Sequence, residues 1–288
     1  METPDWQVQE YNEDFYVLRE SGCVHYEKPF LYLIFGKDRA LLQDSGAGKA
    51  TTRVIVDQVM GRWLERKQRH SIPLLVVHSH SHGDHTAGDS QLAARPMTEV
   101  VPATVAGVKK AYGIRNWPLE IGHIDLGGRT IDAIGVPGHD AAAVALYDRA
   151  TGVLLTGDNL YPGRLYVRDW PAFTASAQRL VDFTKGRVVT HILGNHIEQR
   201  DIPYREYTIG SMFQPQEHAL ELTRGHLLEL NDALTSSGGK PARLAYRDFT
   251  VWPMTPEVER EMNQIEHENS ARQRKNMWRQ PESTGDLK

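Results

Sequence analysis

The sequence predicts an α/β fold, and three observations support that class. Residues 30–35 and 72–77 are short apolar runs, as in buried strands. Residues 49–68 carry apolar side chains among charged ones at helical spacing, which is typical of a helix packed on a sheet. Further short strand patterns follow in pairs joined by turns. We therefore expect strands and helices to alternate along the chain.

The composition is ordinary for a globular enzyme. Hydrophobic residues make up 40% and charged residues 24% of the 288 residues, and the net charge is −4. This balance favours neither nucleic-acid nor membrane binding, and no apolar run reaches the ~18 residues of a membrane span. Cys23 is the only cysteine, which excludes an internal disulfide. The acidic start has no apolar leader segment, so we expect a cytoplasmic protein.

In the first half of the chain, the irregular alternation over residues 6–18 indicates one or two edge strands. A turn at residues 36–39 makes 40–44 the hairpin partner of the strand before it. The other elements expected in this half are the helix at 49–68, a strand at 72–77, a helix-like segment at 84–94, a strand at 99–101 and a helix at 104–112.

The second half is predicted to continue with two hairpins and a further strand. The hairpins span residues 124–136, around a Gly-Gly turn, and 142–155. The elements expected after them are a strand at 187–193, an amphipathic helix at 216–234, a short strand within 242–251 and a highly charged helix at 256–278. The last ten residues are expected to be disordered because they are polar and carry few anchors.

The segment His80-Ser81-His82-Gly83-Asp84-His85 directly follows the 72–77 strand. Residues two apart in an extended chain point to the same side, so His80 and His82 can converge on one ion. Asp84 and His85 follow a glycine where the chain turns, which aims them beside that ion. Imidazole and carboxylate ligands suit zinc, and also iron or manganese. A plain polar loop is the alternative, but the junction with a buried strand favours a metal site.

The pattern His80-x-His82-x-Asp84-His85 resembles the signature of the metallo-β-lactamase superfamily of metallo-hydrolases, and no subfamily, glyoxalase II-like or lactonase-like, is identified. The resemblance implies an αββα sandwich, with residues 1–215 as the catalytic domain and 216–288 as a C-terminal helical extension. It also requires three more ligands, each at the end of a strand. The residues that fit are His139 after Pro-Gly, Asp158 after Thr-Gly and His196 after Gly-Asn.

The resemblance also implies how two metal ions are held. The first ion is assigned to His80, His82 and His139, the second to Asp84, His85 and His196, and Asp158 lies between them. We expect two zinc ions, and iron or manganese would also fit this donor set. A metal-bound hydroxide would then attack the carbonyl of an ester, thioester, lactone or β-lactam-like amide. Asp84 is expected to be catalytic, by holding the hydroxide and passing a proton to the leaving group.

Several other residues are candidates for supporting the metals or binding substrate. Asp44, in an Asp-Ser-Gly that resembles the family's Asp-Thr-Gly, is expected to orient the metal loop. His78 lies two residues before His80, and it either supports the site or packs in the core. Asp140 stands where the family has Ser or Thr, and it is expected to contact His139 or the substrate mouth. The loop after Asp158 supplies Tyr161 and Tyr166 as pocket walls and Arg164 or Arg168 as a carboxylate or phosphate receptor, unless these residues simply pack.

The same metal motif serves other functions, which stay as alternatives. Phosphodiesterase or nuclease chemistry would be favoured by a basic groove, and this acidic chain shows no basic cluster. A sulfur dioxygenase of this fold uses one iron and fewer ligands. A scaffold protein would have lost ligands, whereas all seven are present. We expect a small-molecule substrate, no nucleic-acid or membrane partner, and a homo-oligomer formed through the C-terminal helices.

Overall fold

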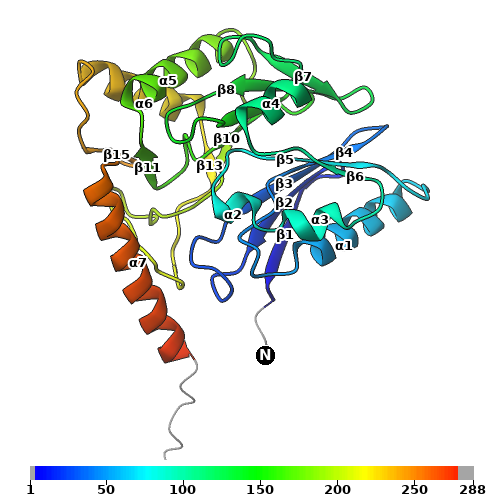
Figure 1. Cartoon of the computed structure of the whole chain (residues 1–288), viewed down its shortest axis with the longest axis horizontal. Helices are drawn as coiled ribbons and strands as arrows, with labels where there is room; N and C mark the ends of the chain where they lie inside the picture. Colours follow the sequence, from blue (N-terminus) through cyan, green and yellow to red (C-terminus); the bar gives the residue numbers. More distant parts are fainter. Residues whose placement is uncertain (1–3, 278–288) are drawn as a thin grey trace, which may run out of the picture.

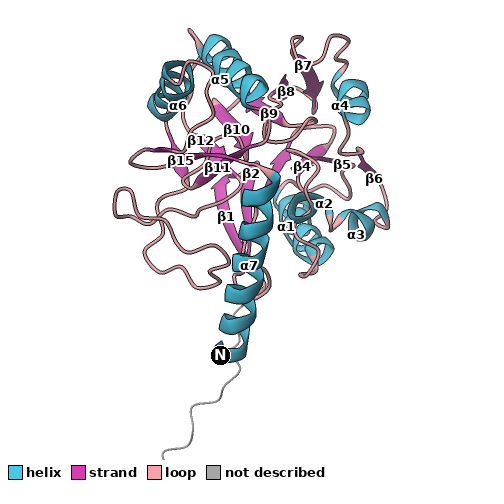
Figure 2. Cartoon of the chain, turned by 60° about the vertical axis from the view of Figure 1, so that its left-hand side comes forward, coloured by secondary structure: helices cyan, strands magenta, loops and turns pink. Residues whose placement is uncertain are grey.

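Two six-stranded sheets pack face to face, and helices cover both outer faces, in the computed structural model of residues 4–277 (Figures 1 and 2). The expected αββα sandwich is therefore confirmed. The last ten residues, for which disorder was predicted, lie outside the described part of the chain. No helix within residues 4–277 combines the length and apolarity needed to cross a membrane.

The first sheet holds the first six strands in chain order. They are β1 (Trp6–Asn12), β2 (Phe15–Glu20), β3 (Phe30–Phe35), β4 (Ala40–Gln43), β5 (Leu74–Val77) and β6 (Thr98–Val100). Strands β1 to β4 pair antiparallel, whereas β5 runs parallel to both β4 and β6. Because β4 and β5 are parallel, Asp44 and the histidine segment leave the sheet at the same edge.

The second sheet has the order β13-β12-β10-β9-β8-β7. Its strands are β7 (Gly122–Asp125), β8 (Thr130–Gly135), β9 (Val144–Asp148), β10 (Val153–Gly157), β12 (Ile192–Gly194) and β13 (Glu221–Leu222). Strand β9 pairs antiparallel with both β8 and β10, and β10 pairs parallel with β12. Strands β8, β10 and β12 therefore point the same way, so His139, Asp158 and His196 all follow carboxyl ends at one edge.

The hydrophobic core lies in three layers. Between the sheets, side chains such as Tyr32 and Leu41 from the first meet Val144 and Leu155 from the second. The outer face of the first sheet is covered by α1 (Thr52–Arg66), whose Trp63 stacks on Phe35 with ring centroids 4.4 Å apart. The outer face of the second sheet is covered by α5 (Trp170–Thr184) and α6 (Arg224–Ser236). Each fully buried large side chain contributes roughly 1.5–3 kcal/mol of hydrophobic stabilisation.

Two of the predicted elements near the site have different bounds. The helix expected over 84–94 is two short helices, α2 (Gly83–Thr86) and α3 (Asp89–Ala93). Gly88 between them lies so close to Ser45 that an added Cβ would be 2.1 Å from the Ser45 carbonyl oxygen, so this position has no room for a side chain. The strand expected over 187–193 is limited to β12. Helix α4 (Val105–Tyr112) follows the prediction, with Thr104 as its N-cap.

The chain after residue 216 contains strands as well as helices. The helix expected over 216–234 begins only at Arg224, because β13 pairs with β12 and Thr223 caps α6. A third sheet has the order β11 (Arg164–Val167), β15 (Thr250–Pro253) and β14 (Leu244–Ala245), and α7 (Pro256–Met277) follows it. A domain boundary at 215/216 and self-association through the C-terminal helices stay predictions.

Candidate metal centre

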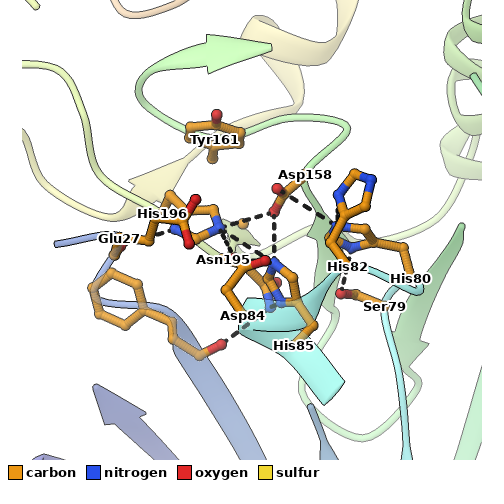
Figure 3. Close-up of polar contacts among 12 residues, drawn as sticks. Glu27, Ser79, His80, His82, Asp84, His85, Asp158, Tyr161, Asn195 and His196 are labelled. Atoms are coloured by element: carbon orange, nitrogen blue, oxygen red, sulfur yellow. Dashed lines mark hydrogen bonds and ion pairs between the residues drawn. The ribbon is translucent and has the colours of Figure 1, made fainter. Parts of the chain in front are cut away.

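The seven side chains predicted as metal ligands lie together at the edge where both sheets end. Figure 3 shows most of them, with Asp158 between the His80 and His196 sides of the centre. They form three groups whose ligand atoms all lie within 4.8 Å of one another: His80, His82 and His139; Asp84, His85 and His196; and His80, His85 and Asp158. The structure thus joins residues from four separate segments into one cluster.

In the first group, three imidazoles point inward. His82 Nδ1 lies 2.8 Å from His80 Nε2 and 3.1 Å from His139 Nε2. The outer nitrogen of His139, Nδ1, donates to the Tyr166 carbonyl at 2.7 Å. Gly138 permits this placement, because its φ of +136° and its position against Phe173 leave no room for a side chain.

In the second group, two imidazoles and a carboxylate converge. Asp84 Oδ2 lies 2.8 Å from His85 Nε2 and 3.2 Å from His196 Nε2. The outer nitrogens donate to acceptors: His85 Nδ1 to Asp44 at 3.0 Å and His196 Nδ1 to the carbonyl of Glu27 at 3.0 Å. Each of these histidines is therefore oriented by a fixed hydrogen bond on its outer side.

Asp158 faces both groups at once. Its Oδ2 faces the first group, 3.8 Å from His80 Nε2 and 3.6 Å from His139 Nε2. Its Oδ1 faces the second group, 3.7 Å from His85 Nε2 and 3.4 Å from His196 Nε2. Oδ1 is buried and has no hydrogen-bond partner among the described residues. One oxygen for each group is the arrangement that a bridging carboxylate needs.

The buried carboxylate of Asp44 is hydrogen-bonded to residues of both ligand groups, directly or through Ser79. It accepts hydrogen bonds from Ser79 N at 2.7 Å and Ser79 Oγ at 2.8 Å, from His85 Nδ1, and from the Asn195 amide. Since the Ser79 hydroxyl donates to Asp44, its oxygen accepts from His80 Nδ1 at 3.0 Å. One carboxylate thereby orients a histidine of each group.

The donor set fits divalent cations. The outer ring nitrogen donates a hydrogen bond and so carries the proton in His80, His85, His139 and His196. In the neutral form of each ring the inner nitrogen then keeps its lone pair, and these lone pairs face one another and the carboxylates. Protons or metal ions stabilise nitrogens and carboxylates that face one another in this way. Nitrogen ligands with a few carboxylates suit zinc, and these residues therefore fit the pair of ions that the sequence predicts.

The electrostatics differ between the two groups. Burial lowers the pKa of His80 and His139 and lowers that of His82 to about 4, so the first group is neutral at pH 7. Burial alone would also lower the pKa of His85 and His196, but Asp84 and Asp158 outweigh it and raise both above the ordinary value. The second group therefore attracts positive charge more strongly.

Two candidates of the sequence analysis lie outside the cluster. His78 turns toward α3, where its Nε2 is 2.8 Å from Asp89 Oδ1, because the chain leaves its extended course after β5. Asp140 does not contact His139. It accepts from Ser81 Oγ at 2.7 Å and from Ala142 N at 2.8 Å, and so it joins the metal loop to the β8–β9 connection.

Tyr161, Arg164 and Tyr166 meet at a carboxylate that the sequence analysis did not single out. Glu198 accepts from the Tyr161 hydroxyl at 3.1 Å, the Tyr166 hydroxyl at 3.3 Å and Arg164 N at 2.8 Å. Arg164 is buried and pairs with Glu198 at 3.2 Å and Glu206 at 3.0 Å. Its expected role as a receptor for a substrate carboxylate or phosphate is corrected accordingly, since its charge is neutralised within the protein.

A cavity of about 240 Å³ opens above the centre. Its walls include Tyr26 and Glu27, the segment 208–211 and α7, in addition to the metal cluster. These walls were not predicted, because no motif links α7 or Glu27 to the histidines. For Glu27 the one clue in the sequence is its position just before the Phe30–Phe35 strand, whose first residue lies beside Asn195.

Comparison with known protein families identifies the family of this chain. The sequence profile of the metallo-beta-lactamase superfamily matches residues 29–208, more than half of the chain. Among curated proteins, the acyl-coenzyme A thioesterase MBLAC2 of Gallus gallus is 30% identical over 79 residues, which cover 25% of this chain and 28% of that protein. The chain thus matches little more than a quarter of that relative's length.

Solved structures of low sequence identity share the fold. The metallo-beta-lactamase FIM-1 from Pseudomonas aeruginosa, in its mono-zinc form, has a TM-score of 0.56 at 12% identity, over 84% of this chain and 99% of that one. A metallo-beta-lactamase from Pontibacter korlensis has a TM-score of 0.51 at 16% identity, over 66% and 91% of the two chains. At these identities the likeness concerns the fold alone.

Proposed function

Because the chain belongs to the metallo-beta-lactamase superfamily, we propose that it is a dinuclear zinc hydrolase that cleaves a carboxylic thioester or ester. Family membership supports a metal-dependent hydrolase in general, and the donor set supports the finer assignment. The observation that carries the proposal is the pair of ligand groups joined by Asp158, with one carboxylate oxygen toward each.

One ion would be held by His80, His82 and His139. The other would be held by Asp84, His85 and His196, and Asp158 would contact both ions. When bound, two such ions lower the pKa of a water and polarise a carbonyl, which supplies the nucleophile and the electrophilic assistance. The protein's own contribution is orientation. The hydrogen bonds from His80 through Ser79 to Asp44, and from His85 to Asp44, fix the ring planes before a ligand arrives.

Asp84 is the chain's own acid–base group. Its carboxylate lines the cavity, and the neighbouring histidines hold its pKa well below the usual range although burial alone would raise it. It is therefore ionised at neutral pH. An ionised carboxylate in that place accepts the proton that the attacking water loses and returns it to the departing thiolate or alkoxide.

The thioester is preferred among carbonyl substrates because the curated relative is named a thioesterase. That relative matches only a short part of this chain, so its name supports the reaction type and not the leaving group. Lactone and β-lactam-like substrates stay alternatives within the same chemistry. A cytoplasmic location stays a prediction.

The test is hydrolysis by the zinc-loaded full chain. An acetyl thioester and p-nitrophenyl acetate are compared with bis(p-nitrophenyl) phosphate and with oxygen uptake on a persulfide. We expect turnover of the acetyl compounds and a fall in kcat of about 10²–10⁴-fold in Asp84→Asn, the usual contribution of a proton-transfer group. Asp125→Asn, in a remote turn, is the charge control. Hydrolysis of the phosphodiester alone, or oxygen uptake with one iron, would overturn the proposal.

A further inference from the structure

His82 differs from the other four histidines of the metal centre in the group that meets its outer ring nitrogen. The other four donate outward, to hydroxyl, carbonyl or carboxylate oxygens. The outer nitrogen of His82, Nε2, instead lies 2.9 Å from Nη1 of Arg168. An arginine side chain only donates hydrogen bonds, so Nε2 accepts here and does not carry the ring proton.

The ring proton of His82 is therefore on the inner nitrogen. That nitrogen, Nδ1, points into the first ligand group, 2.8 Å from His80 Nε2 and 3.1 Å from His139 Nε2. His80 Nε2 has a free lone pair and can accept this proton, because the other nitrogen of its ring is the one that donates to Ser79. In this tautomer the inner nitrogen of His82 has no lone pair for a metal ion.

A metal ion and Arg168 make opposite demands on His82. A neutral imidazole binds a metal through an unprotonated nitrogen, and its other nitrogen then carries the proton. With an ion at Nδ1, the proton lies on Nε2, where it faces the N–H of Arg168 across 2.9 Å. Two donors at this distance repel each other. Filling of the first site therefore requires Arg168 to leave His82.

Arg168 is held against His82 from two sides. Its backbone N–H donates to the carbonyl of Gly138 at 2.9 Å, next to the ligand His139. Its Nη2 donates to Glu259 of α7 at 2.7 Å. The side chains of this pair are 40% and 44% exposed, so the guanidinium has room to turn away. The ion pair with Glu259 restrains that movement.

Helix α7 presents Glu259 from a fixed position. The chain enters α7 from β15, which pairs with β11, and Met254 N donates to the carbonyl of the last residue of β11 at 2.8 Å. Farther along, Asn269 and Gln273 of α7 are hydrogen-bonded to the loop of residues 208–214. Arg168 therefore links the first ligand group to the helix that forms one wall of the cavity.

We propose that Arg168 is a positioning residue that opposes metal binding at the first site, because it holds His82 in the tautomer whose Nδ1 cannot bind an ion. The proposal rests on the two-site assignment of the proposed function. A hydrogen bond to a charged group must be broken when the ion binds, so removing the donor should tighten zinc binding at this site by about tenfold or more.

The zinc affinity of each site, measured by competition with a chelator, tests the proposal. Arg168→Gln removes the charged donor and offers Nε2–H an amide oxygen. The substitution is made in a His196→Ala background to measure the first site and in a His139→Ala background to measure the second. We expect zinc to bind about tenfold or more tightly at the first site. The second site should change by less than about threefold, the effect of one charge at ~8 Å in water.

Two controls accompany this measurement. Arg260→Gln removes the same charge from an exposed position of α7 that does not line the cavity, and it should leave both affinities unchanged. Circular dichroism checks that each variant is folded. An unchanged affinity of the first site in Arg168→Gln would overturn the proposal, as would an equal gain at both sites, which a plain charge effect produces.

Nuclear magnetic resonance of the zinc-free full chain locates the ring proton of His82 without any reference to turnover. Long-range correlations between ring protons and nitrogens identify the protonated nitrogen, and His82→Ala assigns the signal. We expect the proton on Nδ1 in the zinc-free protein and on Nε2 after zinc is added. A proton on Nε2 of His82 in the zinc-free protein would contradict the role of Arg168.

These outcomes separate the role of Arg168 from the hydrolase function. If no thioester or ester is hydrolysed but the first site tightens as expected, the hydrolase function fails and the role of Arg168 stands. If hydrolysis is observed but both sites respond equally to Arg168→Gln, only the role of Arg168 fails. If the His196→Ala protein binds no zinc, the two-site assignment fails and the role of Arg168 fails with it.

Discussion

The carboxylate of Asp44 lies 3.0 Å from His85 Nδ1, and both side chains are fully buried. Through Ser79 the same carboxylate also orients His80. Asp44, which directly follows β4, therefore fixes the ring orientation of one histidine in each ligand group. Strands β4 and β5 are parallel neighbours, and Gln43 pairs with Val77 at their carboxyl ends. This pairing brings Asp44, which follows β4, beside the histidine segment that follows β5.

Replacing Asp44 should weaken both metal sites. Asp44→Asn keeps the shape of the side chain but loses the charged acceptor, and we expect metal affinity to fall about 10–100-fold, as is usual when such a supporting hydrogen bond is lost. Titration with a competing chelator measures this, and circular dichroism checks that the variant is folded. Unchanged affinity at both sites would show that Asp44 supports only the fold.

Glu198 should matter more for stability than a surface carboxylate. Glu198→Ala leaves the buried Arg164 with Glu206 alone and frees the Tyr166 hydroxyl, whereas the Tyr161 hydroxyl keeps the Arg164 carbonyl as its acceptor. We expect a loss of about 3–5 kcal/mol in the free energy of unfolding. Urea denaturation of the metal-free protein measures it. Glu268→Ala, on the exposed side of α7, is the control and should change stability by less than about 0.5 kcal/mol.

Gly138→Ala should displace His139. The residue has a φ of +136°, and an added Cβ would lie 2.5 Å from Phe173, so backbone strain and collision act together. We expect a destabilisation of roughly 1–3 kcal/mol and a weakened first metal site. Gly128→Ala is the matched control, since its φ is +75° but nothing lies within 4 Å of the added atom. Equal effects of the two substitutions on zinc binding would contradict the prediction.

Acid should empty the second site before the first. The pKa of His85 and His196 is raised, so protons compete with a metal ion there as pH falls below neutral. The pKa of His82 is about 4 and that of His80 is also lowered, so the first site keeps its neutral imidazoles to lower pH. Zinc binding measured between pH 7 and 5 should show affinity lost first at one of two sites. Parallel loss at both would contradict this order.

The candidate ligands were found in short segments of the sequence. His80 to His85 follow an apolar strand, and the resemblance to the superfamily then points to His139, Asp158 and His196, each at the end of a short strand. The walls of the cavity could not be predicted in this way. Glu27, Glu198 and Glu266 reach the site only through tertiary packing of segments that carry no motif.

The short strands show the same limit for the fold. β12 and β13 have three and two residues, too few for a periodic pattern, and they exist because neighbouring strands offer hydrogen bonds. The long helix α7 was predicted from its charge pattern, but its contacts with the 208–214 loop were not.

We propose that seven side chains hold two metal ions in two linked sites. Zinc content per folded chain, measured by elemental analysis for the wild type, His139→Ala and His196→Ala, distinguishes two sites from one. The predicted result is two equivalents in the wild type and about one in each variant, because each substitution removes a ligand of one site. A wild type that takes up no more than one equivalent, or variants that both retain two, would contradict it.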